Sequence, residues 1–260
     1  MIDSRLPPYL SYTSISTYIK CPELFYRRYI LGEKEEGVIP FVIGKAFHRS
    51  MEQNFTHKIA HGVDLSNRSV EIIFNEAFDE SAAEDGFNVK DLEDEKRVAW
   101  RLVEQYHREM APFITPLAVE KKLEMDLPGT KIKKLIGYVD LITDKNVVVD
   151  YKAAAWPWAD ALVTQSLQPT VYGLLLNKGT LHFEYHMIIK SDSIRKEKFG
   201  DGLVIKSTVR REKDYEWLRS LITKMIRLVE NEDLYDYIIP NPGQQCLTCP
   251  SRKTCGYRTR

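Results

Sequence analysis

The sequence of 260 residues has no excess of charge of either sign, because 37 Lys and Arg residues balance 37 Asp and Glu residues. A protein that attracts nucleic acid over its whole surface carries a net positive charge, so the composition excludes that kind of general attraction. Contact with a polyanion must therefore rest on local basic groups. The candidates are Arg210, Arg211, Arg252, Lys253 and Arg258.

Long apolar runs are also missing, and none of the apolar stretches is long enough to span a bilayer. The first ten residues contain Asp3 and two prolines, and they lack the charged start and apolar centre of a signal peptide. A cytoplasmic location is the resulting expectation.

The GxxxxGK[ST] phosphate loop of ATP-driven motors does not occur in the sequence. The chain is therefore not expected to be a helicase itself, and a motor that worked with it would be a separate polypeptide. Internal repeats and low-complexity linkers are absent as well, which favours a single domain over residues 1–260.

Cysteine is scarce, with four residues in the chain. In a reducing compartment these thiols are not expected to form disulfides, so their spacing is better compared with that of metal ligands. Cys246, Cys249 and Cys255 lie in CLTCPSRKTC, and Cys21 lies near the other end of the chain. Four thiolates suit either tetrahedral zinc or an iron–sulfur cluster, and the residues alone leave both open.

The first 110 or so residues have mostly helical patterns. Thr13 or Ser14 is a candidate N-cap for a helix to about Lys20, and Pro22 suits the first turn of a second short helix. Further helices are expected around FVIGKAFHRSMEQNF and over about 69–84 and 91–110, where apolar residues recur on one helical face.

Beyond Pro116 the pattern changes to strands separated by turn residues. Strands are expected at about 117–127, 131–143, 147–153, 181–189 and 203–209, with a helix ending at Gly179 and a long helix over about 214–231. The predicted fold is a mixed α/β sheet of about five strands flanked by helices. Its parts would be a helical region over 1–112, a core over 113–235 and a Cys-rich tail over 236–260.

The stretch GYVDLITDKNVVVDYK, residues 137–152, is a predicted β-hairpin that carries charge within apolar strands. Alternation places Val148, Asp150 and Lys152 on one face, and the hairpin can bring Asp140 close to Asp150. Two neighbouring carboxylates repel each other unless a cation lies between them, which favours a divalent metal site. A structural Asp–Lys ion pair at a sheet edge is the alternative from the hairpin alone.

Asp140 followed ten residues later by Asp150-Tyr-Lys152 resembles the signature of the PD-(D/E)xK nuclease superfamily, with Val139 in place of the proline. This resemblance implies a restriction-endonuclease-like fold in which Asp140 and Asp150 bind Mg²⁺ or Mn²⁺. It further implies that Lys152 assists the attacking water.

Three more motifs resemble the RecB-like branch of that superfamily. By this resemblance GKAFHRSME would place His48 as a further metal ligand, although a lone histidine on such a helix more often packs in a core. Gln168 and Tyr172 match the branch's Q-x-x-x-Y motif, which is expected to meet DNA beside the active site. Glu120 lies where related enzymes place another acidic residue, and Glu124 on the same face remains an alternative.

One cysteine near the start and three near the end of the chain are similar to the iron–sulfur staple of this branch, as in the AddB nuclease domain and CRISPR-adaptation nucleases. The resemblance therefore implies that a 4Fe-4S cluster is bound by Cys21, Cys246, Cys249 and Cys255. Because such a cluster would close a very long loop, its expected role is structural.

The sequence thus favours a metal-dependent DNA nuclease, expected to be an exonuclease that acts on single strands or DNA ends. A noncatalytic iron–sulfur DNA-binding or scaffold subunit of a recombination, repair or CRISPR-adaptation complex is the alternative. A zinc-stabilised module with an unrelated role is a third possibility. Asp140, Asp150 and Lys152 together favour the enzyme, because a scaffold has no need of all three.

Overall fold

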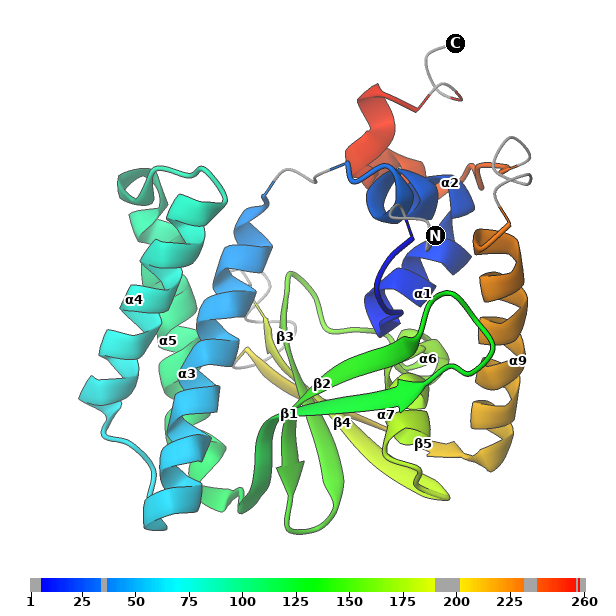
Figure 1. Cartoon of the computed structure of the whole chain (residues 1–260). Coiled ribbons are helices and arrows are strands. Elements are labelled where there is room, and N and C mark those ends of the chain that lie inside the picture. Colours follow the sequence, from blue (N-terminus) through cyan, green and yellow to red (C-terminus); the bar gives the residue numbers. More distant parts are fainter. Residues whose placement is uncertain (1–5, 34–36, 190–201, 232–237, 256, 258–260) are drawn as a thin grey trace.

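A computed structural model describes residues 6–33, 37–189, 202–231, 238–255 and 257. Its centre is one five-stranded sheet in the order β1-β2-β3-β4-β5 (Figure 1). The strands are β1 (Pro116–Asp126), β2 (Lys134–Thr143), β3 (Val147–Ala154), β4 (Thr180–Ile189) and β5 (Leu203–Arg211). All neighbouring pairs are antiparallel except β3 and β4, which run parallel. The expected mixed sheet is confirmed.

The parallel pair requires a crossover, which two short helices provide. These are α6 (Asp160–Gln165) and α7 (Gln168–Leu175). Helix α7 begins at Gln168, and Pro169 lies in its first turn, where the missing N–H costs no helical hydrogen bond. The sequence had indicated one helix here where the structure has two, because Ser166 and Leu167 separate them.

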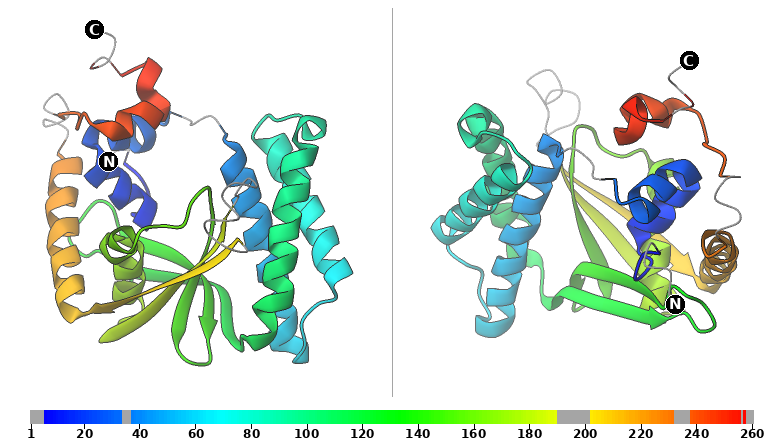
Figure 2. Two further views of the ribbon diagram at one scale, coloured as in Figure 1. Left: turned by 180° about the vertical axis from the view of Figure 1, so that it is seen from behind. Right: turned by 45° about the horizontal axis from the view of Figure 1, so that its top comes forward.

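Helices cover both faces of the sheet (Figures 1 and 2). On one face lie α3 (Ile39–His61), α4 (Asn67–Glu84) and α5 (Glu93–Glu109), and on the other lie α1 (Tyr12–Lys20), α7 and α9 (Glu212–Val229). Each face has its own apolar cluster, with Val149 of β3 in one cluster and Val148 in the other. The predicted alternation of β3 side chains is confirmed.

Local sequence explains where the helices begin and end. Ser11 caps α1 with a reciprocal hydrogen-bond pair to Ser14, so the helix begins at Tyr12 and the predicted caps Thr13 and Ser14 lie inside it. Gly62 ends α3 in the left-handed region at φ 76°, which glycine adopts without steric cost. The remaining short elements are α2 (Pro22–Phe25), η1 (Tyr26–Ile30), η2 (Val89–Leu92), η3 (Ala111–Phe113), η5 (Gln244–Thr248) and η6 (Pro250–Lys253).

The two ends of the chain lie side by side, with η5 and η6 against α1 and α2 (Figures 1 and 2). The main-chain N–H of Asn241 donates to Cys21 Sγ at 3.4 Å, and Arg27 Nη1 donates to Thr254 Oγ1 at 3.3 Å. Among the described helices none is long and apolar enough to cross a membrane.

Candidate active site

The β2–β3 ladder opens where its two aspartates lie. The strands pair at Leu141–Val149 and Ile142–Val148, and beyond this point the Tyr151 amide donates to Asp140 Oδ2 at 2.8 Å. The Asp140 carboxylate thus takes the place of a main-chain acceptor within the sheet. Asp140 is 6% exposed and Asp150 is 2% exposed, so both carboxylates are removed from bulk water.

Helix α3 brings His48 to this opening. His48 Nδ1 lies 3.3 Å from Asp140 Oδ2, and Nε2 lies 2.9 Å from the Tyr151 carbonyl oxygen. Since a carbonyl only accepts, Nε2 carries a proton and Nδ1 faces the carboxylate. The main chain of Tyr151 therefore orients both His48 and Asp140. Burial acts to lower the pKa of His48, but Asp140 and Asp150 outweigh it and raise this pKa to about 9.

Strand β1 adds Glu120, which lies opposite Asp140 in a register that pairs Val119 with Leu141 and Lys121 with Val139. Its backbone is left-handed at φ 45°, an unfavourable conformation for a residue with a side chain. Burial, with a contribution from Asp140, raises the pKa of the Glu120 carboxyl to about 7.

One ligand atom each from His48, Glu120 and Asp140 lies within 4.8 Å of the others. Glu124, the alternative acidic residue, instead pairs at the surface with Lys122 at 3.0 Å and Lys134 at 2.6 Å. Of the two candidates on this strand, the structure brings Glu120 to the site and directs Glu124 away from it.

Asp150 forms a buried ion pair with Lys152, with 2.5 Å between Oδ2 and Nζ. Burial raises the pKa of Asp150, and the Lys152 ammonium opposes this rise. Burial acts to lower the pKa of Lys152, but the Asp150 carboxylate outweighs it and raises this pKa. Lys152 is therefore an ammonium group at neutral pH. The three clustered ligand atoms include Glu120 and not Asp150, and the expectation that Asp150 also binds the metal stays a prediction.

Gln168 and Tyr172 lie behind Asp150 instead of at the surface. Gln168 Nε2 donates to Asp150 Oδ1 at 2.5 Å and to the Tyr172 hydroxyl at 3.2 Å. That hydroxyl donates to the Tyr138 carbonyl at 2.6 Å. Both side chains are buried, so their contacts orient the Asp150 carboxylate and fix α7 against β2.

A cleft of about 690 Å³ opens over these groups between the start of α3 and strands β1 and β3. His48, Glu120 and Lys152 reach it from three different elements. Its outer wall contains the exposed Phe41 and the basic residues Lys45 and Arg49. The cleft thus combines a carboxylate–imidazole cluster with ammonium and guanidinium groups, a composition that suits a phosphate ester and a metal ion.

A sequence profile of the PD-(D/E)XK nuclease superfamily matches residues 9–256, nearly the whole chain. This chain belongs to the PD-(D/E)XK nuclease superfamily. Within the matched range, Asp140 lies on β2 and Asp150 and Lys152 lie on β3.

The fold of this chain is also similar to that of solved structures. A "Putative exonuclease" from Eubacterium rectale is similar with a TM-score of 0.56 and 16% identity, over 96% of this chain and 94% of that one. SSO0001 aligns over 87% of this chain and 88% of its own at 12% identity, with a TM-score of 0.37. No curated protein matches this chain.

The four cysteines of this PD-(D/E)XK nuclease line one small cavity of about 30 Å³ between the chain ends. Burial raises the pKa of the Cys249 thiol, and the other three cysteines add to the rise. Zn–S bonds of about 2.3 Å would place the sulfurs about 3.8 Å apart in a tetrahedral site. Among the described residues no three cysteine sulfurs lie within 4.8 Å of one another, so metal binding by these cysteines stays a prediction.

Of the basic residues suggested for DNA contact, Arg210 is buried at 6% exposure. Its guanidinium donates to Thr170, Thr208 and main-chain carbonyls of the α6–α7 segment. The prediction that Arg210 touches DNA directly is wrong, because protein acceptors use its donors. Arg211, Arg252 and Lys253 are exposed, and Arg258 lies outside the described residues.

Proposed function

We propose that this PD-(D/E)XK nuclease is a metal-dependent deoxyribonuclease that hydrolyses phosphodiester bonds in single strands or at DNA ends. The observation that carries the proposal is the cluster of His48, Glu120 and Asp140 beside the Asp150–Lys152 pair. His48, Glu120 and Lys152 of this group line one cleft. A noncatalytic scaffold would gain nothing from a buried ion pair that opens onto a cluster of metal-ligand side chains.

The donor set fits a hard divalent cation. His48, Glu120 and Asp140 offer one imidazole nitrogen and two carboxylates, which suit Mg²⁺ and, because of the nitrogen, Mn²⁺. The Tyr151 carbonyl fixes the His48 ring so that Nδ1 is turned toward the carboxylates, as an outer hydrogen bond does for metal-binding histidines. A metal ion bound there would act as a Lewis acid and lower the pKa of a bound water.

Lys152 has a separate role in this proposal. Its ammonium is held by Asp150 at 2.5 Å, and Asp150 is held in turn by Gln168. A positioned cation stabilises negative charge that develops on the phosphate oxygens during attack by water. Since its raised pKa keeps Lys152 protonated, the residue supplies charge and orients water instead of removing a proton.

We further propose that the protein is of the RecB-like branch and that its four cysteines bind a cluster between the two ends of the chain. Cys21, Cys246, Cys249 and Cys255 line one cavity, although their sulfurs are not clustered, and this shared cavity supports a RecB-like nuclease with a 4Fe-4S staple. Residues 1–112, 113–235 and 236–260 would then act as one nuclease domain, because the two apolar clusters and the cysteine cavity each join distant parts of the chain.

The proposal is tested by incubating the protein with linear single-stranded, linear double-stranded and circular single-stranded DNA, in Mg²⁺, Mn²⁺ or EDTA. We expect cleavage only with metal, linear strands cut in preference to circles, and a loss of at least about 100-fold in Asp140→Asn and Lys152→Met. Asp144→Asn in the exposed turn of the same hairpin is the matched control and should keep full activity. Cleavage in EDTA, or in folded Asp140→Asn, would overturn the assignment, while equal cleavage of circles would overturn the exonuclease part alone.

A further inference from the structure

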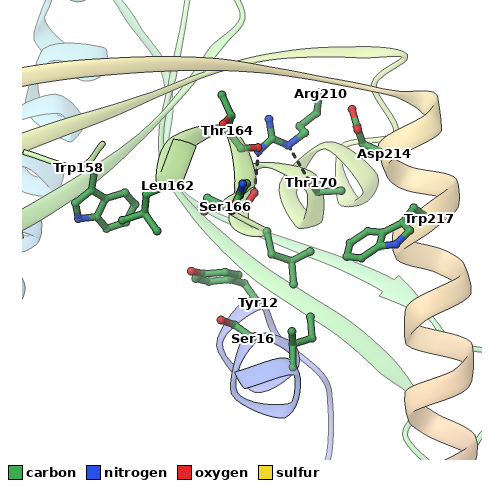
Figure 3. A pocket seen from close by; sticks show the side chains of 13 residues that line it. Tyr12, Ser16, Trp158, Leu162, Thr164, Ser166, Thr170, Arg210, Asp214 and Trp217 are labelled. Carbon is green, nitrogen blue, oxygen red and sulfur yellow. Dashed lines mark hydrogen bonds between the residues drawn. The ribbon is translucent and has the colours of Figure 1, made fainter. Parts of the chain in front are cut away.

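A second cavity of about 650 Å³ lies at α1, the α6–α7 segment, β5 and α9 (Figure 3). Its lining residues differ from those of the metal cleft, so it is a separate space. Tyr12 and Ser16 border it from one side, Trp158 and Leu162 from another, and Trp217 from the third. These residues take no part in the proposed hydrolysis.

Tyr185 joins this cavity to the active-site lysine. Lys152 Nζ lies 5.9 Å from the centre of the Tyr185 ring, and the Tyr185 hydroxyl forms a 2.6 Å hydrogen bond with Ser166 of the cavity wall. Trp158 packs on the same ring with 4.9 Å between centroids. The buried Tyr185 ring thus separates Lys152 from the cavity, and the cavity begins one aromatic side chain away from the lysine.

Arg210 places a positive charge at the cavity wall without a carboxylate in contact. Its donors bond to hydroxyls and carbonyls, including 2.9 Å to Thr170 Oγ1 and 2.8 Å to the Thr164 carbonyl. In the described part of the chain no ion pair includes Arg210, and Asp214 on the same wall acts on it only through space. Because no carboxylate contacts the guanidinium, part of its positive potential reaches the cavity, reduced by Asp214 on the same wall, and attracts a phosphate without a direct hydrogen bond.

The side chains at the mouth suit a flat ring with polar edges. Trp217 is 56% exposed, although large aromatic side chains are commonly buried, and Trp158 and Tyr12 present further rings. Hydroxyl and amide groups of Ser16, Thr164 and Gln165 lie among these rings. Aromatic faces with interspersed polar groups are the usual platform for an unpaired nucleobase.

We propose that this cavity binds one unpaired nucleotide of the DNA strand, next to the phosphate held at Lys152. The base stacks on Trp217 or Trp158, and the potential of Arg210 attracts the adjoining backbone. The proposal rests on the proposed nuclease function and adds a site that would favour single-stranded over paired DNA, since a base in a duplex cannot enter.

The test measures binding without cleavage, in EDTA, by fluorescence anisotropy of a 12-nucleotide oligo(dT) labelled at one end. A series of strands with one abasic position each locates the nucleotide whose base matters. We expect one position at which loss of the base weakens binding roughly five- to tenfold. Trp217→Ala should weaken binding of the intact strand by a similar factor and abolish the difference between intact and abasic strands.

Two variants make the result specific. Trp217→Phe keeps an aromatic face and should restore most of the binding, while Phe113→Ala removes an aromatic side chain that is 83% exposed and does not line the cavity. Phe113→Ala should bind as wild type. A wild-type protein that cuts DNA yet shows a flat abasic series would overturn this inference and leave the nuclease intact.

A wild-type protein that neither cuts nor binds DNA would instead overturn the proposed function. The abasic series needs no variant, so misfolding of Trp217→Ala cannot hide the outcome. If Trp217→Ala leaves DNA binding and the abasic difference unchanged, the cavity does not hold a base. Occupation by an apolar side chain of a partner protein would give that same result.

Discussion

His48 lies between a carboxylate and a main-chain carbonyl, and this position links metal binding to pH. Its raised pKa of about 9 means that the metal-free site holds a proton at neutral pH, which a metal must displace. The favourable interaction of protonated His48 is fully present below its ordinary pKa of 6.5 and is lost as the pH rises toward 9. Without metal, the protein should therefore lose stability over this range.

We predict that Mn²⁺ raises the melting temperature more at pH 8.5 than at pH 6.5. Proton competition weakens as the pH rises, so the affinity measured by titration calorimetry should increase in step. His48→Asn should bind Mn²⁺ more weakly and show a smaller dependence on pH. A wild-type affinity that is flat from pH 6.5 to 8.5 would remove His48 from the ligand set.

At the level of single residues, the sequence predicted which charged side chains gather at the proposed site better than it predicted the contacts that surround them. Asp140, Asp150 and Lys152 could be predicted because charge within apolar strands is rare. The sequence could not predict the left-handed backbone of Glu120 or the burial of Arg210, because both depend on residues distant in the chain. Gln168 was predicted by its motif, but its contact with Asp150 follows only from how α7 packs.

Among the elements, α7 is held closely between β2 and α9. A Cβ at Gly173 would lie 2.4 Å from the Tyr215 hydroxyl, and one at Gly137 would lie 2.9 Å from Leu175. Both glycines therefore allow the close approach that places Gln168 against Asp150. Glycine inside a helix is otherwise unfavourable by about 1 kcal/mol relative to alanine.

Two helical glycines should consequently respond in opposite ways to alanine. Gly173→Ala should lower the free energy of unfolding by about 1 to 3 kcal/mol, because Tyr215 is buried in the core and cannot move away freely. Gly44→Ala in α3 meets nothing within 4 Å and should raise it by up to about 1 kcal/mol. Urea unfolding of both variants measures the contrast, and a stabilised Gly173→Ala would show that α7 is loosely packed.

The strands were predicted closely because alternation and turn residues are local signals. The N-cap of α1 and the division between α6 and α7 were missed, since they depend on one and two residues whose effect the apolar pattern does not reveal. The parallel pairing of β3 with β4 is a tertiary property that appears only once the crossover helices pack.

For the whole molecule, the decisive contact is between the two chain ends at the cysteine cavity. A metal cluster bound there would close a loop of most of the chain, which would restrict the unfolded state and stabilise the folded one. We predict a brown protein with four irons per chain when it is purified without oxygen. Cys21→Ser and Cys249→Ser should lose iron, melt earlier and become protease-sensitive near both ends.

Ser251→Ala is the control for the cysteine variants, because Ser251 lines the same cavity and its hydroxyl donates a 3.3 Å hydrogen bond to Glu33, while its main-chain hydrogen bonds are kept in alanine. It should keep its iron and its melting temperature. A colourless protein with one zinc per chain would refute the iron cluster and retain the staple. A cysteine variant with an unchanged melting temperature would refute the staple.

The main chain of Tyr151 has a consequence for how such a site is mapped by mutagenesis. Its amide and carbonyl orient Asp140 and His48, whereas its side chain packs in the core between Phe47 and Tyr106. Every genetic substitution at position 151 except proline preserves both groups, so a complete mutational scan would report core packing and miss the orienting role. Replacing the amide by an ester through chemical synthesis deletes the single N–H and isolates that contribution.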